Sequence, residues 1–255
     1  MNNTTIIQKL SELNYNGAKA AYIRQSEDIH YQNLSFNERF YNLLESQEIY
    51  LANQKISMLQ KLSKIKDKQA SIANIDYLPK RKINKQLIIE LASMNFIKSY
   101  QNVIVSGCTG SGKTYCIQAL GNRAIENGYK TYYIRVPTLL EEIKIARATG
   151  TYINILKKYQ RFQLLILDDF GISQMSSDDA INLLEILEDR VQISSTIIAS
   201  QLPVSSWYEY LNNNTVADAI LDRLVHSSHR LELQGGSMRR IKSTIKKFDE
   251  EIDEI

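Results

Sequence analysis

One short run of residues limits the fold of this chain more than any other, because an apolar segment leads directly into a glycine-rich loop. Residues 103–114 read VIVSGCTGSGKT, and residues 107–114 match the phosphate-loop pattern G-x-x-x-x-G-K-[ST] at every position. In this pattern glycines let backbone N–H groups curl around a polyphosphate, while Lys113 reaches its β- and γ-phosphates. The hydroxyl of Thr114 suits Mg²⁺. The motif needs a strand before it and a helix after it, so it predicts an α/β fold that binds ATP or GTP.

The residues expected to bind the nucleotide at this loop are Gly107, Cys108, Thr109, Gly110, Ser111, Gly112, Lys113, Thr114 and Tyr115.

After residue 100 the sequence alternates between short apolar runs and helical patterns. Strand-like runs lie at 103–106, 131–136, 164–167 and 196–200, with a candidate fifth strand at 230–233, and helical patterns lie at 113–127, 138–148, 151–159 and 178–192. Gly128 suits a helix end and Pro137 the first turn of the next helix. This alternation predicts a five-stranded parallel sheet between two layers of helices.

The first hundred residues form a different region. They contain one glycine and one proline, and their apolar residues recur at helical spacing. Ser35 and Glu38 have the spacing of a capping box, which predicts a long helix from Ser35 towards Ile65. We therefore expect an all-helical N-terminal domain over 1–78, a linker and leading helix over 79–100, an ATPase domain over 101–242 and a charged tail over 243–255.

Charge and cysteine content restrict the function classes. The net charge is only +3, but basic residues are concentrated between 55 and 85, which favours contact with a phosphate backbone and equally suits a solubilising helix face. Two cysteines exclude a disulfide framework or a zinc cluster, and no apolar signal core or membrane span is present, so we expect a cytoplasmic protein. The candidate DNA contacts are Lys55, Lys61, Lys64, Lys80, Arg81 and Lys82, with help from Lys144 and Arg147 on later helices.

A second motif follows the apolar run LLIL at residues 164–167. Asp168 and Asp169 come directly after this run, and ligands bind at the carboxyl edge of an open parallel sheet. Asp168 is expected to support Mg²⁺, and Asp169 to orient the attacking water. Ser200 and Gln201 end the next apolar run, where their polar groups could bond the γ-phosphate or that water.

The segment 215–233 carries further candidates. Arg223 lies on an apolar helix, where it could form a local salt bridge with Asp222 or serve as an arginine finger for a neighbouring subunit's nucleotide. Arg239 or Arg240 could act as a second sensor. His226 and His229 lack a third ligand nearby, which disfavours a metal site.

Together, the helical N-terminal region and the strings GCTGSGKT, LLILDDFG, TIIASQLPVSSWYE and AILDRLVHSSHRLELQGGSMR resemble the IstB family of transposition helper ATPases, which accompany the transposase of IS21-type insertion sequences. The resemblance implies an AAA+ ATPase that forms homo-oligomers on duplex DNA with ATP and Mg²⁺, selects or deforms a target site and stimulates the transposase. It also makes Ser200 and Gln201 the sensor I position, Arg223 the finger and Arg239 the second sensor.

Two positions depart from the common AAA+ pattern. Asp169 stands where many AAA+ proteins have glutamate, and Gln201 where many have asparagine. Both departures predict slow hydrolysis rather than loss of binding. Two other functions remain open: a replicative-helicase loader, against which the cysteine-free N-terminal region argues, and a nucleotide-gated DNA scaffold that scarcely hydrolyses ATP.

Overall fold

The computed structural model describes residues 2–77 and 81–235 of the chain, which fall into two compact units. The first unit is Met1–Lys61 and the second is Leu62–Ile255. Arg239 and the tail predicted at 243–255 lie outside the described residues. Throughout the described ranges, no helix is both long enough and apolar enough to cross a membrane.

The first unit is helical, as predicted. Its elements are α1 (Asn3–Glu12), α2 (Asn16–Glu27), the 3-10 helix η1 (Ile29–Asn33) and α3 (Phe36–Leu62). The capping box at the start of α3 is confirmed, since the Ser35 N–H donates to the Glu38 carboxylate at 2.8 Å and the Glu38 N–H donates to the Ser35 hydroxyl at 3.3 Å. The helix stops at Leu62 rather than continuing to Ile65, because Lys64 has a φ of 60°, which is incompatible with a right-handed helix.

Residues 63–77 pack within the second unit, and not with the N-terminal helices as the boundary at 78 anticipated. Ile65, Ala70 and Ile75 are buried there, and the side-chain amide of Asn122 donates to the carbonyls of Asp67 and Ala70. The 3-10 helix η2 (Ile72–Asn74) lies in this stretch, and α4 (Lys85–Ala92) and α5 (Asn95–Lys98) follow in the predicted linker. This largely polar segment is therefore anchored by hydrogen bonds to its backbone carbonyls, and amino-acid composition does not reveal such bonds.

The second unit contains the predicted five-stranded parallel sheet. Its strands are β1 (Asn102–Gly107), β2 (Thr131–Arg135), β3 (Leu164–Phe170), β4 (Ser195–Ser200) and β5 (Ser228–Leu233). They lie in the order β2-β3-β4-β1-β5, and every pair is parallel. The order places β4 between the phosphate-loop strand and the strand that carries the two aspartates.

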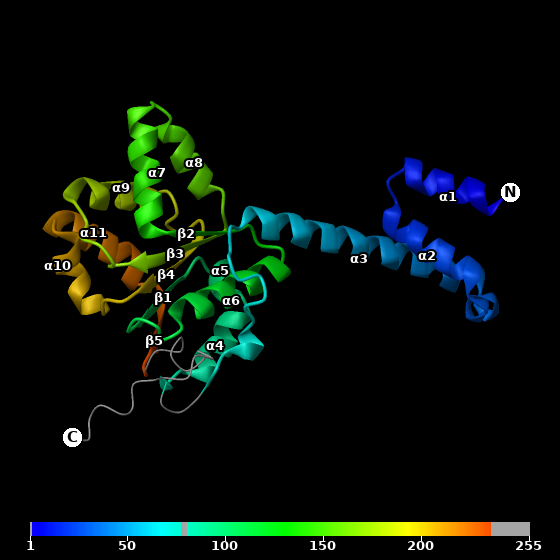
Figure 1. Ribbon diagram of the computed structural model, residues 1–255, viewed down its shortest axis with the longest axis horizontal. Helices are drawn as coiled ribbons and strands as arrows, with labels where there is room; N and C mark the ends of the chain where they lie inside the picture. Colours follow the sequence, from blue (N-terminus) through cyan, green and yellow to red (C-terminus); the bar gives the residue numbers. More distant parts are fainter. Residues whose placement is uncertain (1, 78–80, 236–255) are drawn as a thin grey trace, which may run out of the picture. The chain divides into compact units, whose positions relative to one another are not determined.

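Helices cover both faces of the sheet (Figure 1). On one face lie α4, α5 and α6 (Lys113–Glu126). On the other lie α7 (Val136–Ala148), α8 (Tyr152–Gln160), α9 (Ser177–Glu188) and α11 (Asn214–Val225). The short helix α10 (Trp207–Leu211) lies beside α11, and η4 (Val204–Ser206) lies beside α10. Gly128 has a φ of 81° just after α6, and Pro137 lies in the first turn of α7, as predicted.

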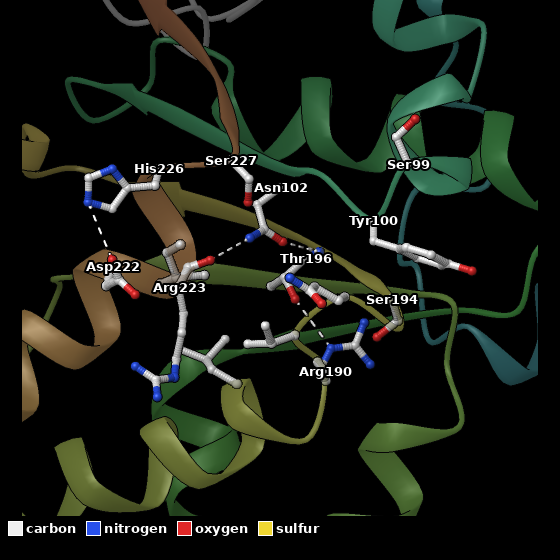
Figure 2. A pocket seen from close by; sticks show the side chains of 14 residues that line it. Ser99, Tyr100, Asn102, Arg190, Ser194, Thr196, Asp222, Arg223, His226 and Ser227 are labelled. Atoms are coloured by element: carbon white, nitrogen blue, oxygen red, sulfur yellow. Dashed lines mark hydrogen bonds and ion pairs between the residues drawn. The ribbon is translucent and has the colours of Figure 1, made fainter.

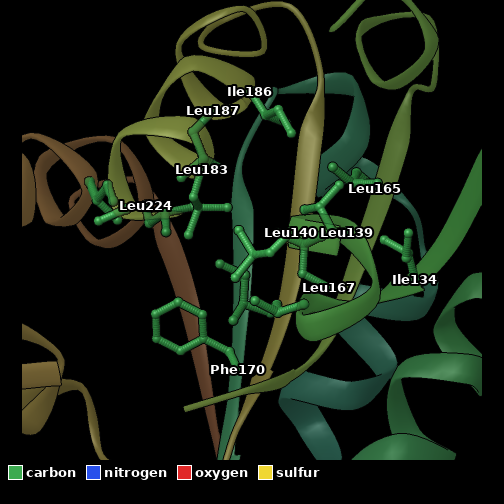
Figure 3. Close-up of a cluster of buried hydrophobic side chains, with 14 of the residues drawn as sticks. Ile134, Leu139, Leu140, Leu165, Leu167, Phe170, Leu183, Ile186, Leu187 and Leu224 are labelled. Carbon is green, nitrogen blue, oxygen red and sulfur yellow. The ribbon is translucent and has the colours of Figure 1, made fainter. Parts of the chain in front are cut away.

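A hydrophobic core fills the space between the sheet and the second helical layer. Leu165, Leu167 and Phe170 project from β3 towards Leu139 of α7 and Leu183 of α9 (Figure 3). All of these side chains are fully buried. This packing fixes β3, so the acidic residues within it have defined positions at the sheet edge.

Candidate active site

The phosphate loop, residues 107–114, joins β1 to α6 and has the conformation that the motif requires. Gly107, Gly110 and Gly112 have φ values of 151°, 79° and 95°, which side chains with a Cβ rarely adopt. The ammonium group of Lys113 donates to the carbonyls of Gly107 at 2.7 Å and Cys108 at 2.9 Å, so it is held inside the loop. No side chain caps α6 at Gly112, which leaves its first N–H groups available to an anion.

Two glycines are also required by close neighbours. A Cβ on Gly107 would lie 2.3 Å from the Leu233 carbonyl oxygen at the end of β5, and a Cβ on Gly112 would lie 2.5 Å from a guanidinium nitrogen of Arg81. The loop is therefore confined on two sides by the rest of the fold.

Arg81 corrects one sequence-based prediction. It was expected to contact DNA, but it is only 7% exposed. Its guanidinium donates to the Asp76 carbonyl and to the Ser111 carbonyl in the phosphate loop, while its own carbonyl accepts the Gln234 N–H. Arg81 thus stabilises the phosphate loop through the Ser111 carbonyl, and its buried guanidinium does not suit a DNA contact.

Asp168 and Asp169 lie at the carboxyl edge of the sheet, at an irregularity in β3. Between Leu167 and Phe170 the pairing with β4 shifts, so that β3 has one residue more than its partner strand. Asp169 takes a φ of 59° at this bulge. Both aspartates thus lie within the bulge, at the carboxyl edge of the sheet.

Asp168 is buried and closely held. Its Oδ2 accepts the Thr114 hydroxyl at 2.9 Å and the Tyr133 hydroxyl at 2.8 Å, and its Oδ1 accepts the Asp169 N–H at 2.9 Å. The two groups expected to ligate Mg²⁺, Thr114 and Asp168, are thus adjacent.

Asp169 is more open than Asp168. Burial, followed by the nearby charge of Asp168, raises the pKa of Asp169 above its ordinary value, while Arg135 opposes the shift from 3.8 Å. A carboxyl group with a raised pKa is a better proton acceptor when it is ionised, which suits a general base.

Two residues at the end of β4, Ser200 and Gln201, were predicted to face the nucleotide, and only Gln201 does so. The Oε1 of Gln201 accepts the Thr109 hydroxyl at 2.7 Å, so Gln201 contacts the phosphate loop. Ser200 is fully buried, and its hydroxyl accepts the Leu202 N–H at 3.0 Å. Ser200 therefore shapes the turn, whereas Gln201 faces the site. Tyr115 likewise points away, because its hydroxyl accepts the Ser71 N–H.

Arg223 lies at the opposite edge of the sheet. Its carbonyl accepts the side-chain amide of Asn102, the first residue of β1, and its guanidinium pairs with Glu188 rather than with Asp222. A pocket of about 400 Å³ opens beside it (Figure 2). Since β1 has six residues and rises about 3.3 Å per residue, roughly 16 Å of strand separates Arg223 from the phosphate loop at the end of β1.

The remaining candidate cations have varied surroundings. Lys55 and Lys61 are exposed in the first unit, as are Lys64 and Lys82 in the second, whereas Lys80 lies outside the described residues. Lys144 pairs with Asp179 at 3.2 Å, and Arg147 pairs with Glu185 at 3.5 Å, so both join α7 to α9. Both are exposed, and each already pairs with a carboxylate of α9.

The site fits a nucleoside triphosphate with Mg²⁺. The Ser111 hydroxyl in the loop is buried and has no hydrogen-bond partner among the described residues, and the loop offers glycines, a buried ammonium group and an uncapped helix N-terminus to an anion. Hydroxyl and carboxylate oxygens, from Thr114 and Asp168, are ligands that Mg²⁺ prefers. Within the described ranges no group of three or more His, Cys, Asp or Glu side chains forms a further metal site.

Comparison with known proteins identifies the family. The family model described as IstB-like ATP binding protein matches residues 8–246. This chain belongs to the IstB family. A Sinorhizobium fredii relative, y4pL, named as an insertion sequence ATP-binding protein, is 36% identical over 92% of this chain and 95% of its own length. A Pseudomonas fluorescens relative, named for insertion sequence IS1162, is 36% identical over 68% of this chain and 75% of its own.

Solved structures share the fold of this IstB protein over about two thirds of its length. DnaI aligns with a TM-score of 0.58 at 21% identity, covering 66% of this chain and 92% of DnaI. AMPPCP-bound DnaA from Aquifex aeolicus aligns with a TM-score of 0.56 at 19% identity, covering 67% of this chain and 52% of DnaA. The fold is that of AAA+ P-loop ATPases.

Proposed function

We propose that this IstB protein is an ATPase that assembles on duplex DNA and delivers a target site to the transposase of its insertion sequence. The observation that supports the proposal is that the candidate catalytic residues lie at two opposite edges of the sheet. Lys113, Asp168 and Asp169 lie at the carboxyl edge, while Arg223 lies roughly 16 Å away at the amino edge.

Each residue at the carboxyl edge has a defined task. The phosphate loop and Lys113 bind the β- and γ-phosphates, and Thr114 and Asp168 hold Mg²⁺, which neutralises charge on the phosphates when bound. Gln201 lies beside Thr109 of the loop, where its amide is suited to orient a water molecule. Asp169 accepts a proton from that water, and its shorter side chain favours slow turnover.

Arg223 completes the site only from a neighbouring subunit. An arginine side chain cannot span the length of β1, so Arg223 cannot reach the nucleotide of its own chain. Supplied across an interface, it neutralises charge that develops on the transferred phosphoryl group. ATP then links subunits, and assembly and nucleotide binding become coupled equilibria.

DNA binding is expected to depend on exposed lysines of both units. Lys55, Lys61, Lys64 and Lys82 are available for phosphates, whereas Arg81 is not. Contacts to phosphates carry no base code, so target choice is loose and binding weakens steeply with salt. The names of the relatives associate them with insertion sequences, which supports a transposase as the protein partner.

The test mixes two variants that are each expected to be inactive. Arg223→Ala keeps its nucleotide pocket but lacks the finger, and Lys113→Ala cannot bind ATP but still offers Arg223. In an equimolar mixture, about a quarter of random interfaces pair an intact pocket with an intact finger, so ATPase activity returns in part. A mixture as inactive as its components refutes the shared site, and absence of phosphate release from the unaltered protein with duplex DNA refutes the ATPase.

A matched binding assay addresses the DNA. Duplex and single-stranded competitors are compared at several salt concentrations with a non-hydrolysable ATP analogue, with and without nucleotide. Nucleotide-dependent assembly on duplex DNA supports the proposal, whereas equal coating of DNA without nucleotide contradicts it.

A further inference from the structure

A ladder of polar side chains on α6 connects the phosphate loop to residues 63–70, the segment that directly follows α3. Thr114, Gln118 and Asn122 are spaced four residues apart, so they lie on one face of the helix. Thr114 contacts Asp168, Gln118 accepts the Asp67 N–H at 2.8 Å, and Asn122 donates to the carbonyls of Asp67 and Ala70 at 2.9 and 2.8 Å.

Tyr133 on β2 closes this network from the other side. Its hydroxyl donates to Asp168 Oδ2 at 2.8 Å, and its backbone N–H donates to the Ser63 carbonyl at 2.7 Å. Burial raises the pKa of Tyr133, and the side chain of Gln118 acts in the opposite direction, which indicates that Gln118 lies near this hydroxyl. Tyr133 is 5% exposed and Asp168 is 2% exposed, so these bonds are shielded from water.

The segment packs closely against α6. Gly121 has no room for a Cβ, because the Cδ1 atoms of Ile65 and Ile166 would lie 2.7 and 2.6 Å away. Ile65 is buried between lysines that point to solvent: Lys64, Lys66 and Lys68 are exposed. One face of the segment thus carries charge available to a polyanion, and the other is bonded to the catalytic edge.

We propose that Tyr133 and Gln118 are positioning residues that couple segment 63–70 to Asp168, so that ordering of the segment and seating of Mg²⁺–nucleotide reinforce each other. The inference rests on the proposed function, in which Asp168 holds Mg²⁺. The coupling is reciprocal: Mg²⁺–nucleotide orders the segment, and a ligand on the segment's lysines strengthens Mg²⁺ binding by the same factor. Binding of a ligand to the segment would thereby change the affinity for Mg²⁺ at the site of hydrolysis.

The first test measures Mg²⁺ affinity without turnover. Binding of the fluorescent analogue mant-ATP is followed in EDTA and then during titration with MgCl₂, for the unaltered protein, Tyr133→Phe and the control Tyr132→Phe, whose ring faces the opposite side of β2 near Phe162. Tyr133→Phe is expected to bind mant-ATP normally in EDTA but to need about ten-fold more Mg²⁺, the usual loss when a partner of a metal ligand is removed. The control is expected to match the unaltered protein.

The second test measures hydrogen exchange with AMPPCP, with and without Mg²⁺. In the unaltered protein, Mg²⁺ is expected to slow exchange over 63–70. In Tyr133→Phe and Gln118→Met this Mg²⁺-dependent protection is lost, while protection of the first turn of α6 by AMPPCP remains, which shows that the variants are folded and bind nucleotide.

The outcomes distinguish failure of the coupling from failure of the proposed function. If the variants match the unaltered protein in both assays, the coupling is wrong and the proposed function stands. If the unaltered protein shows no Mg²⁺-dependent nucleotide binding at all, the proposed function fails and the inference fails with it.

Discussion

Replacing Arg190 by methionine is expected to destabilise the second unit strongly. Arg190 is only 2% exposed, and its guanidinium donates to the carbonyls of Tyr159, Phe162 and Ser195 at 2.7, 2.8 and 2.6 Å. It also donates to the Thr196 hydroxyl at 3.2 Å. One side chain therefore satisfies acceptors from the end of α8, the turn after it and the start of β4.

The size of the effect follows from these acceptors. Methionine fills a similar volume but removes the guanidinium donors from three carbonyls, and a buried acceptor that loses its donor costs about 1–3 kcal/mol. The neighbouring pocket admits water, which can recover part of that cost. We therefore expect the free energy of unfolding to fall by about 3–5 kcal/mol, as when one partner of a buried charged contact is removed.

Urea unfolding of the full chain measures this change. Trp207 is the single tryptophan and is fully buried 4.5 Å from the ring of Phe170, so its fluorescence reports unfolding of the second unit. Arg161→Met is the matched control, because Arg161 is exposed and its substitution is expected to change stability by less than about 0.5 kcal/mol. A loss below about 1 kcal/mol for Arg190→Met would refute the assignment of these hydrogen bonds as major stabilising contacts.

Two further predictions concern the active site. Gly112→Ala is expected to weaken binding of an ATP analogue at least ten-fold, because the new Cβ meets Arg81 and the backbone has a positive φ. Gly150→Ala, with a φ of 70° and nothing within 4 Å, controls for a general loss of stability from an alanine at positive φ. Unchanged affinity in Gly112→Ala would contradict this reasoning. Because the pKa of Asp169 is raised, this base becomes protonated at a higher pH than an ordinary aspartate. ATPase kcat/KM should therefore decline as the pH falls through the pKa of Asp169. Arg135→Met removes a positive charge that opposes the shift, and it should move that decline to higher pH; an unmoved profile would show that Asp169 does not control it.

The parts predicted correctly from sequence are those encoded within short windows. The five-stranded parallel sheet follows from strand and helix periodicity, and the phosphate loop follows from the spacing of its glycines and Lys113. The start of α3 after Ser35 follows from a capping pair, Ser35 and Glu38, three residues apart. Each of these was predicted from a pattern of residue types within a short stretch of the chain, although the strands themselves pair with distant segments.

The missed features depend on contacts between distant residues. Arg81 was read as a DNA contact because it lies among lysines, yet it supports Ser111, thirty residues further on. Tyr133 carried no motif, and its role appears only because β2 pairs with β3 in a register that sets Arg135 beside Asp168. Buried tyrosine next to an acidic strand end is a signal that could have suggested this pairing.

Sequence alone predicted which residues bind a triphosphate and indicated the IstB family to which this chain belongs, because the motifs are local patterns of residue type and spacing. Tertiary structure alone decided that residues 63–77 pack within the second unit, that Ser200 is buried while Gln201 contacts the loop, and that Arg223 lies a full strand length from the nucleotide site. These outcomes depend on strand order and on which helix covers which face. A chain reveals such relations only when segments far apart in sequence come together to bury apolar surface and satisfy their backbone hydrogen bonds.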